Sequence, residues 1–141
     1  MSRAVAEEAA GGTPRGLVNL GNTCFLNSAV QALAACAPLA TAFDAAAPLL
    51  LLPSTSKKGA ELTGSFSRLL KDLRPARGAE RSALRPSDLV DLARGLTPAL
   101  EGYGQQDVEE FLNALLDSMH EHLRRPLCEQ VRAREKPSYV A

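Results

Sequence analysis

The stretch QQDVEEFLNALLDSMHEHL, residues 105–123, has the most regular apolar pattern in this chain of 141 residues. Its apolar residues recur at intervals of three and four, as they do on one face of an α-helix. They are Val108, Phe111, Leu112, Leu115, Leu116, Met119 and Leu123. Polar residues occupy the opposite face, so we expect a long amphipathic helix that begins near Gln105 and packs against a helical core.

Another helix is predicted over residues 24–35, where apolar residues again recur at helical spacing. Thr23 is a suitable N-terminal cap for it, and Pro38 is a plausible stop. Cys36 lies in a run of alanines near the end of this helix. Because free cysteine is among the most buried residue types, we expect Cys36 in the core.

Two shorter helices are predicted further along the chain. One begins near Gly64 and ends near Arg74, because Pro75 disfavours a helical residue before it. The other opens at Pro86 and is terminated by Gly95. The loops expected between the helices are residues 48–64 and 74–85.

The composition supports an α-rich chain, because Ala and Leu supply most of the 45% hydrophobic residues and only 4% are aromatic. The 16 basic and 16 acidic side chains cancel, which argues against nucleic-acid binding by phosphate neutralisation. No stretch offers the roughly 20 uninterrupted apolar residues that a membrane span requires. We therefore expect all-α architecture and no nucleic-acid or membrane partner.

The two ends of the chain differ from its middle. Residues 1–15 are rich in Ala, Gly and Glu without apolar periodicity, so we expect a disordered leader. Residues 16–125 form the predicted domain. Residues 126–141 follow Pro126 and lack a convincing period, which predicts a weakly structured tail, either a weak helix or disorder. Nothing before the domain resembles a secretory signal.

Cys24 is the most informative of the three cysteines. A loop containing Gly21 delivers it to the first turn of the helix predicted over residues 24–35, where backbone amides and the helix dipole stabilise anions such as a thiolate. Asn19 can bring a side-chain NH₂ group to the same place. On position alone, the alternative of an inert structural cysteine remains open. Three cysteines without zinc-site spacing favour a reducing compartment, either cytoplasmic or nuclear.

Two strings carry a family resemblance. Residues 16–31, GLVNLGNTCFLNSAVQ, resemble the cysteine box of the ubiquitin-specific proteases, which are papain-like cysteine peptidases. Residues 102–116, GYGQQDVEEFLNALL, resemble the Gln-Gln-Asp box of the same family, in the same order. The resemblance implies that residues 16–125 are the helical thumb of an α+β catalytic domain, without its fingers and palm.

The resemblance also implies roles for four residues. Cys24 aligns with the nucleophile that attacks the C-terminal glycine of ubiquitin, and Asn19 with the side chain that completes the oxyanion hole. Asp107 and Glu110 align with acidic positions near the Arg-rich ubiquitin tail. Their alternative role is ordinary helix-dipole and solvation chemistry. Ubiquitin and ubiquitinated proteins are the implied partners, with no cofactor and no metal.

A cysteine peptidase also needs a histidine, oriented by Asn or Asp, to activate the thiol and protonate the leaving amine. His120 and His122 are the two histidines of the chain, and neither matches the catalytic one of the family. We expect both at the surface or the helix end. The resulting hypothesis is a deubiquitinase segment that is inactive by itself. The alternatives are a non-catalytic ubiquitin-binding or regulatory fragment, and an all-α interaction domain whose cysteine box is fortuitous.

Overall fold

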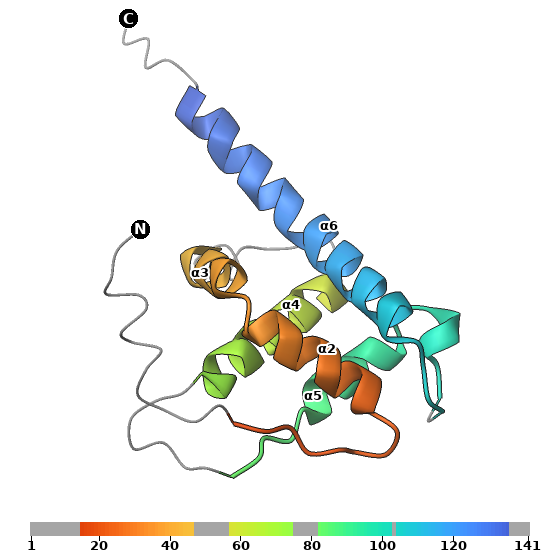
Figure 1. Cartoon of the computed structure of the whole chain (residues 1–141). Helices are drawn as coiled ribbons and strands as arrows, with labels where there is room; N and C mark the ends of the chain where they lie inside the picture. The colour runs from red at the N-terminus through yellow and green to blue at the C-terminus, as the bar shows by residue number, and fades with distance from the viewer. Residues whose placement is uncertain (1–14, 47–56, 75–81, 103, 136–141) are drawn as a thin grey trace, which may run out of the picture.

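The computed structural model describes residues 15–46, 57–74, 82–102 and 104–135. The regular elements in these ranges are all helical, which confirms the α-rich prediction (Figure 1). A single parallel bridge joins Leu17 to Leu84. The elements are α2 (Cys24–Ala34), α3 (Ala37–Ala46), α4 (Lys57–Leu73), α5 (Ser87–Arg94), the 3-10 helix η2 (Pro98–Leu100) and α6 (Val108–Glu135).

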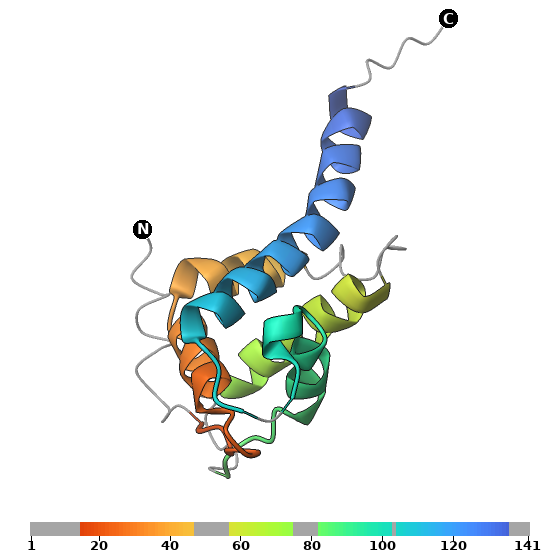
Figure 2. The ribbon, with the colours of Figure 1, turned by 90° about the vertical axis from the view of Figure 1, so that its right-hand side faces the viewer.

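Helix α4 lies at the centre of the bundle and packs against both α5 and α6, while α2 packs against α6 and α3. Figure 2 shows the N-terminal part of α6 lying across the other helices and its C-terminal part extending beyond them. The core is built from the apolar faces of these helices. Its largest fully buried side chains are Phe66, Phe111, Leu26, Leu62, Leu70, Leu89, Leu115 and Val30.

Pro38 was predicted to stop the helix that contains Cys24, but it lies at the start of the next helix, α3. Helix α2 ends at Ala34, as predicted to within one residue, and the chain then bends by 81° into α3. Pro38 lies in the first turn of α3, where its missing amide would have no helical partner in any case. Helix α3 was not predicted from the sequence. The prediction that Cys36 lies in the core is wrong as well, because this residue lies exposed at the corner between the two helices.

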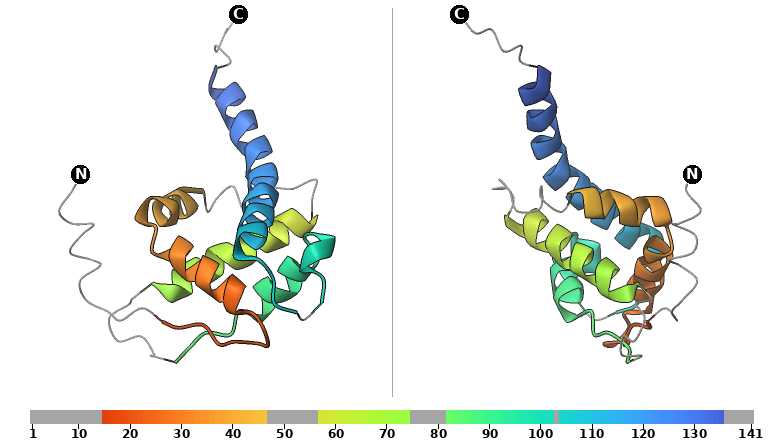
Figure 3. Two further views of the ribbon diagram at one scale, coloured as in Figure 1. Left: turned by 45° about the vertical axis from the view of Figure 1, so that its right-hand side comes forward. Right: turned by 90° about the vertical axis from the view of Figure 1, so that its left-hand side faces the viewer.

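Helix α3 is tied to the rest of the bundle by two interactions. The Phe43 ring packs edge-on against Phe66 of α4, with 5.3 Å between ring centroids. The guanidinium of Arg74 donates two hydrogen bonds to the Asp44 carboxylate, at 2.7 and 3.0 Å. This pairing lowers the pKa of Asp44 and raises that of Arg74. Figure 3 shows α3 stacked over one end of the α2 and α4 pair.

Helix α4 begins at Lys57, about two turns earlier than predicted. Its apolar face starts at Leu62, which is fully buried, and the Thr63 hydroxyl donates to Gly59 O at 2.7 Å within the same turn. The loop predicted over residues 48–64 is therefore wrong for its last part, whereas residues 48–56 lie outside the described ranges. Helix α5 ends at Arg94, with Gly95 as its C-cap, as predicted.

Helix α6 differs from its prediction at both ends. It begins at Val108 because Asp107 caps it: the Asp107 carboxylate accepts the amides of Glu109 and Glu110. The helix then continues through Pro126 to Glu135, so it includes the first part of the predicted tail. Proline lacks the amide that would donate to the carbonyl of His122, so this turn has one hydrogen bond fewer. Residues 1–14 and 136–141, including most of the predicted leader, lie outside the described ranges.

None of the described helices is alone long and apolar enough to cross a membrane. Only α2 and α3 taken together pass that test, by length and composition, and they are the pair bent by 81°.

Candidate active site

The segment that precedes α2 runs back along this helix and is held there by the side chain of the N-cap residue Thr23 and by two α2 side chains, Asn27 and Gln31. Asn27 and Gln31 are four residues apart, so they lie on one face of the helix. The bonds run from Gln31 Nε2 to Arg15 O (2.9 Å), from Asn27 Nδ2 to Val18 O (3.2 Å), and from Leu20 N to Thr23 Oγ1 (3.0 Å). Asn27 and Gln31 thus hold the preceding loop through its backbone carbonyls. This ladder of side chains places the loop against the N-terminus of α2.

The loop closes onto α2 through a tight turn at Gly21 and Asn22. Gly21 has φ = +93° and Asn22 has φ = +50°, values that suit glycine and are tolerated by asparagine. Inside the turn, Asn19 Oδ1 accepts three hydrogen bonds of 3.1 Å, from Gly21 N, Thr23 N and the Thr23 hydroxyl. The carbonyl end of the Asn19 carboxamide is therefore bound within the loop, and its NH₂ group forms the opposite end.

Cys24 is the first residue of α2, and it is exposed. Thr23 occupies the N-cap position, as predicted, but its side chain makes no capping bond to α2. The first α2 amide with a helical acceptor is that of Asn27, which donates to Thr23 O at 2.9 Å. The amides of residues 24–26 are thus available at the positive end of the helix dipole, where they stabilise a thiolate or an oxyanion.

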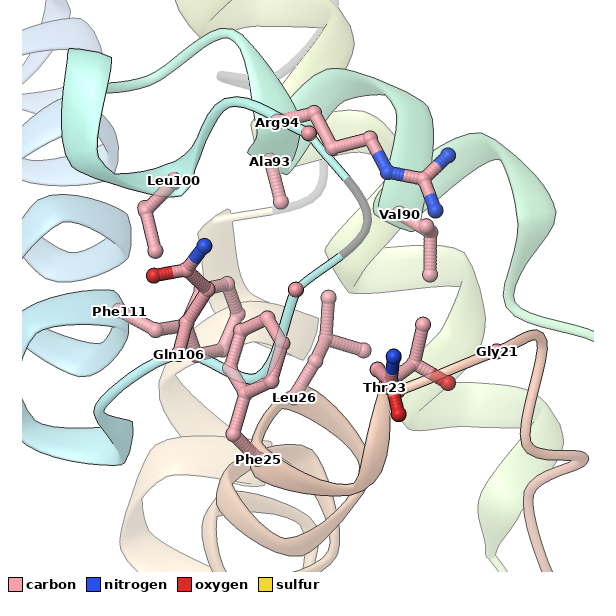
Figure 4. Close-up of a pocket in the computed structure, with 13 residues that line it drawn as sticks. Gly21, Thr23, Phe25, Leu26, Val90, Ala93, Arg94, Leu100, Gln106 and Phe111 are labelled. Carbon is pink, nitrogen blue, oxygen red and sulfur yellow. The ribbon is translucent and has the colours of Figure 1, made fainter.

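A small cavity, which we call the α2 cavity, lies beside the start of α2 (Figure 4). Its volume of about 20 Å³ is enough for roughly one water molecule. Cys24 is not among its lining residues, although both of its chain neighbours are. The Phe25 ring meets Phe111 of α6 edge-on at 5.6 Å and 79°. This contact connects the turn that carries the cysteine directly to α6.

A wider groove, the acidic groove, runs along the N-terminal part of α6, with a volume of about 530 Å³. It is lined by Thr97, Asp107, Glu109, Glu110, Asn113, Ala114 and Asp117. The structure therefore brings the predicted Asp107 and Glu110 together and adds Glu109 and Asp117, which the sequence analysis did not single out. The sequence already indicated this negative charge, because residues 101–121 include six acidic residues and no Lys or Arg. Gln106 lines the α2 cavity, and the next residue in the chain, Asp107, lines the acidic groove.

The histidines lie elsewhere. His120 is exposed, but His122 is only 4% exposed, and α6 continues to Glu135. The expectation that both histidines lie at the surface or the helix end is therefore wrong for His122. Burial lowers the pKa of His122. His122 is eleven residues beyond Phe111 on α6, roughly 16 Å along the helix axis. Because a general base must be within hydrogen-bond reach, neither histidine serves Cys24 in this arrangement.

No three His, Cys, Asp or Glu side chains in the described part of the chain gather into a possible metal site. Asn19 and Cys24 share the loop and helix start, whereas Asp107 and Glu110 share the groove on α6. The side chain of Cys128 lies outside what the structure describes.

Comparison with known proteins places these features in a family. A model of the ubiquitin carboxyl-terminal hydrolase family matches residues 15–141. The chain is also 34% identical over 123 residues to ubiquitin carboxyl-terminal hydrolase 2 of Rattus norvegicus. That alignment covers 87% of this chain but 19% of the relative, so the chain spans about a fifth of the length of this relative. All four predicted site residues lie within the matched range.

Proposed function

The chain belongs to the ubiquitin carboxyl-terminal hydrolase family, and from this premise we propose that it carries the nucleophile side of a thiol-dependent deubiquitinase. Its helices would form the thumb of the papain-like domain. The observation that carries the proposal is an exposed cysteine at the uncapped start of α2, with the Asn19 carboxamide bonded to the preceding residue. One short segment thus supplies the Cys24 nucleophile, the backbone amides at the start of α2 and the Asn19 side-chain donor.

The proposed chemistry is acyl transfer. The Cys24 thiolate attacks the carbonyl carbon of the terminal glycine of ubiquitin, a C–S bond forms, and the carbonyl oxygen becomes an oxyanion. The Cys24 amide and the Asn19 NH₂ group stabilise that charge. The C–N bond then breaks, the amine leaves with a proton, and water hydrolyses the thioester. Because the leaving amine requires a proton donor, this half of the reaction needs a histidine placed at Cys24.

The acidic groove is the proposed site for the ubiquitin tail, which is Arg-rich. Four carboxylates line the groove without a basic side chain, and this charge complements a basic peptide. Asp107 Oδ1 accepts the two hydrogen bonds that cap α6. The other oxygen of the Asp107 carboxylate can therefore accept from a ligand. Glu110 is exposed beside it. Both residues therefore combine a place in the helix start with access to the groove.

We also propose a cytoplasmic or nuclear location. Cys24 and Cys36, the cysteines described in side-chain detail, are both free thiols, and a reducing compartment keeps thiols in that state.

The test is hydrolysis of ubiquitin carrying a C-terminal aminocoumarin amide by the purified 141-residue chain. We expect no turnover, because neither histidine reaches Cys24. Turnover that disappears in Cys24→Ala would contradict the proposed inactivity while supporting the assignment of the nucleophile. Ubiquitin binding without turnover that is weakened by Glu110→Gln would support the groove, and binding unchanged by that substitution would count against it.

A further inference from the structure

We propose that Thr23 is a positioning residue, which sets the orientation of the Asn19 carboxamide so that its NH₂ group serves the oxyanion. The inference rests on the proposed function, because it concerns how the same site is held. Thr23 is only 3% exposed, so its hydroxyl must find partners within the protein. Both partners lie in the loop that precedes Cys24.

The Thr23 hydroxyl has a fixed direction. Its oxygen accepts a hydrogen bond from Leu20 N at 3.0 Å, and its single proton is donated to Asn19 Oδ1 at 3.1 Å. The Leu20 amide cannot act as an acceptor, so the hydroxyl proton is directed to Asn19. The hydroxyl is therefore a dedicated donor to the carboxamide oxygen.

Three donors converge on that oxygen, and together they determine which end of the carboxamide faces them. A rotated Asn19 would set its own NH₂ donors against the amides of Gly21 and Thr23 and against the Thr23 hydroxyl. Donor facing donor would leave the amide and hydroxyl of the buried Thr23 without their acceptor, which is unfavourable. The observed orientation keeps the NH₂ group outside the turn, where a ligand can accept from it.

Accepting three hydrogen bonds also polarises the carboxamide. Donors on the oxygen draw electron density from the nitrogen, so the NH₂ group becomes a stronger donor. Thr23 does not act as a helix cap, since its side chain makes no bond to the α2 amides. Its hydroxyl is thus committed to the loop and to Asn19.

Two reactions of the Cys24 thiol separate this role from a general effect on folding. In acylation by p-nitrophenyl acetate, the thiolate adds to the carbonyl carbon, an oxyanion forms, and p-nitrophenolate leaves without a proton donor. In alkylation by iodoacetamide, the thiolate displaces iodide and no oxyanion forms. The protein is the 141-residue chain with Cys36→Ser and Cys128→Ser, which leaves one thiol. The readout is the ratio of the acylation rate to the alkylation rate.

We expect Thr23→Val to lower this ratio by up to about tenfold, the effect of losing one hydrogen bond, and Thr23→Ser to preserve it. Asn19→Ala should lower the ratio at least as much. Because Thr23 acts through Asn19, adding Thr23→Val to Asn19→Ala should lower it no further. Amide spectra of each variant would verify the fold.

Two results would overturn the inference: an unchanged ratio in Thr23→Val, which includes an equal loss of both rates, or full additivity with Asn19→Ala. In either of these cases, a lowered ratio in Asn19→Ala alone would leave the proposed function intact. If instead Asn19→Ala leaves the ratio unchanged, the oxyanion assignment in the proposed function fails, and the role of Thr23 fails with it.

Discussion

The contact between Phe25 and Phe111 links the cysteine turn to α6, and its removal tests the fold where it supports the site. Phe111 is fully buried, so Phe111→Ala should lower the free energy of unfolding by about 3–5 kcal/mol. The edge-on pairing with Phe25 accounts for about 0.5–1.5 kcal/mol of this loss. A domain is typically stable by only about 5–15 kcal/mol, so the variant should be severely weakened.

Urea unfolding followed by far-ultraviolet circular dichroism measures this loss. Val108→Ala is the matched control, because Val108 lies on the same helix but is 45% exposed, and it should change stability by no more than about 0.5 kcal/mol. A double-mutant cycle of Phe25→Leu and Phe111→Leu isolates the ring pair. A loss below about 1 kcal/mol in Phe111→Ala, or no coupling in the cycle, would refute the packing of α2 on α6.

Three further changes test the turn, the buried histidine and the α6 cap by urea unfolding. Gly21→Ala should destabilise by roughly 1–2 kcal/mol because φ is +93°, whereas Gly64→Ala, inside α4 with open space around its Cβ, should stabilise by about 0.5–1 kcal/mol. Equal effects would contradict the turn geometry. Burial lowers the pKa of His122, so its contribution to stability is complete above the unfolded pKa of about 6.5 and is lost as the pH falls below it. His122→Gln should reduce this loss of unfolding free energy at low pH, whereas His120→Gln should not. An undiminished loss in His122→Gln would count against the burial of His122. Asp107→Ala should cost about 1 kcal/mol and Asp107→Asn much less, because asparagine retains the cap, so equal losses would argue against capping.

The helices that the sequence predicted well are those whose ends are marked locally. Helix α5 has Pro86 before it and Gly95 after it, and α2 has its apolar face within eleven residues. The start of α4 has no such mark, because its first turn is polar. It is supported instead by Lys58, whose ammonium donates to Gly95 O, 37 residues away in the sequence. A contact between distant segments leaves no periodic signal in either of them.

The same distinction applies to the candidate site. The position of Cys24 at a helix start follows from Gly21 and the apolar period after it, and the structure agrees. The orientation of Asn19 does not follow, because it depends on three donors that meet only when the turn closes. The burial of His122 and the exposure of Cys36 likewise depend on how α6 and α3 pack, which periodicity within one helix does not specify.

We propose that Cys24 is the nucleophile and that its surroundings, more than its exposure, make it so. Cys36 is also an exposed free thiol, and it serves as an internal control in the same molecule. The most direct measurement is the partition of label between these two cysteines after reaction with ubiquitin that carries a C-terminal electrophile, read by peptide mass spectrometry. We expect the adduct at Cys24, with little at Cys36. Equal labelling of both cysteines, or preference for Cys36, would contradict the claim.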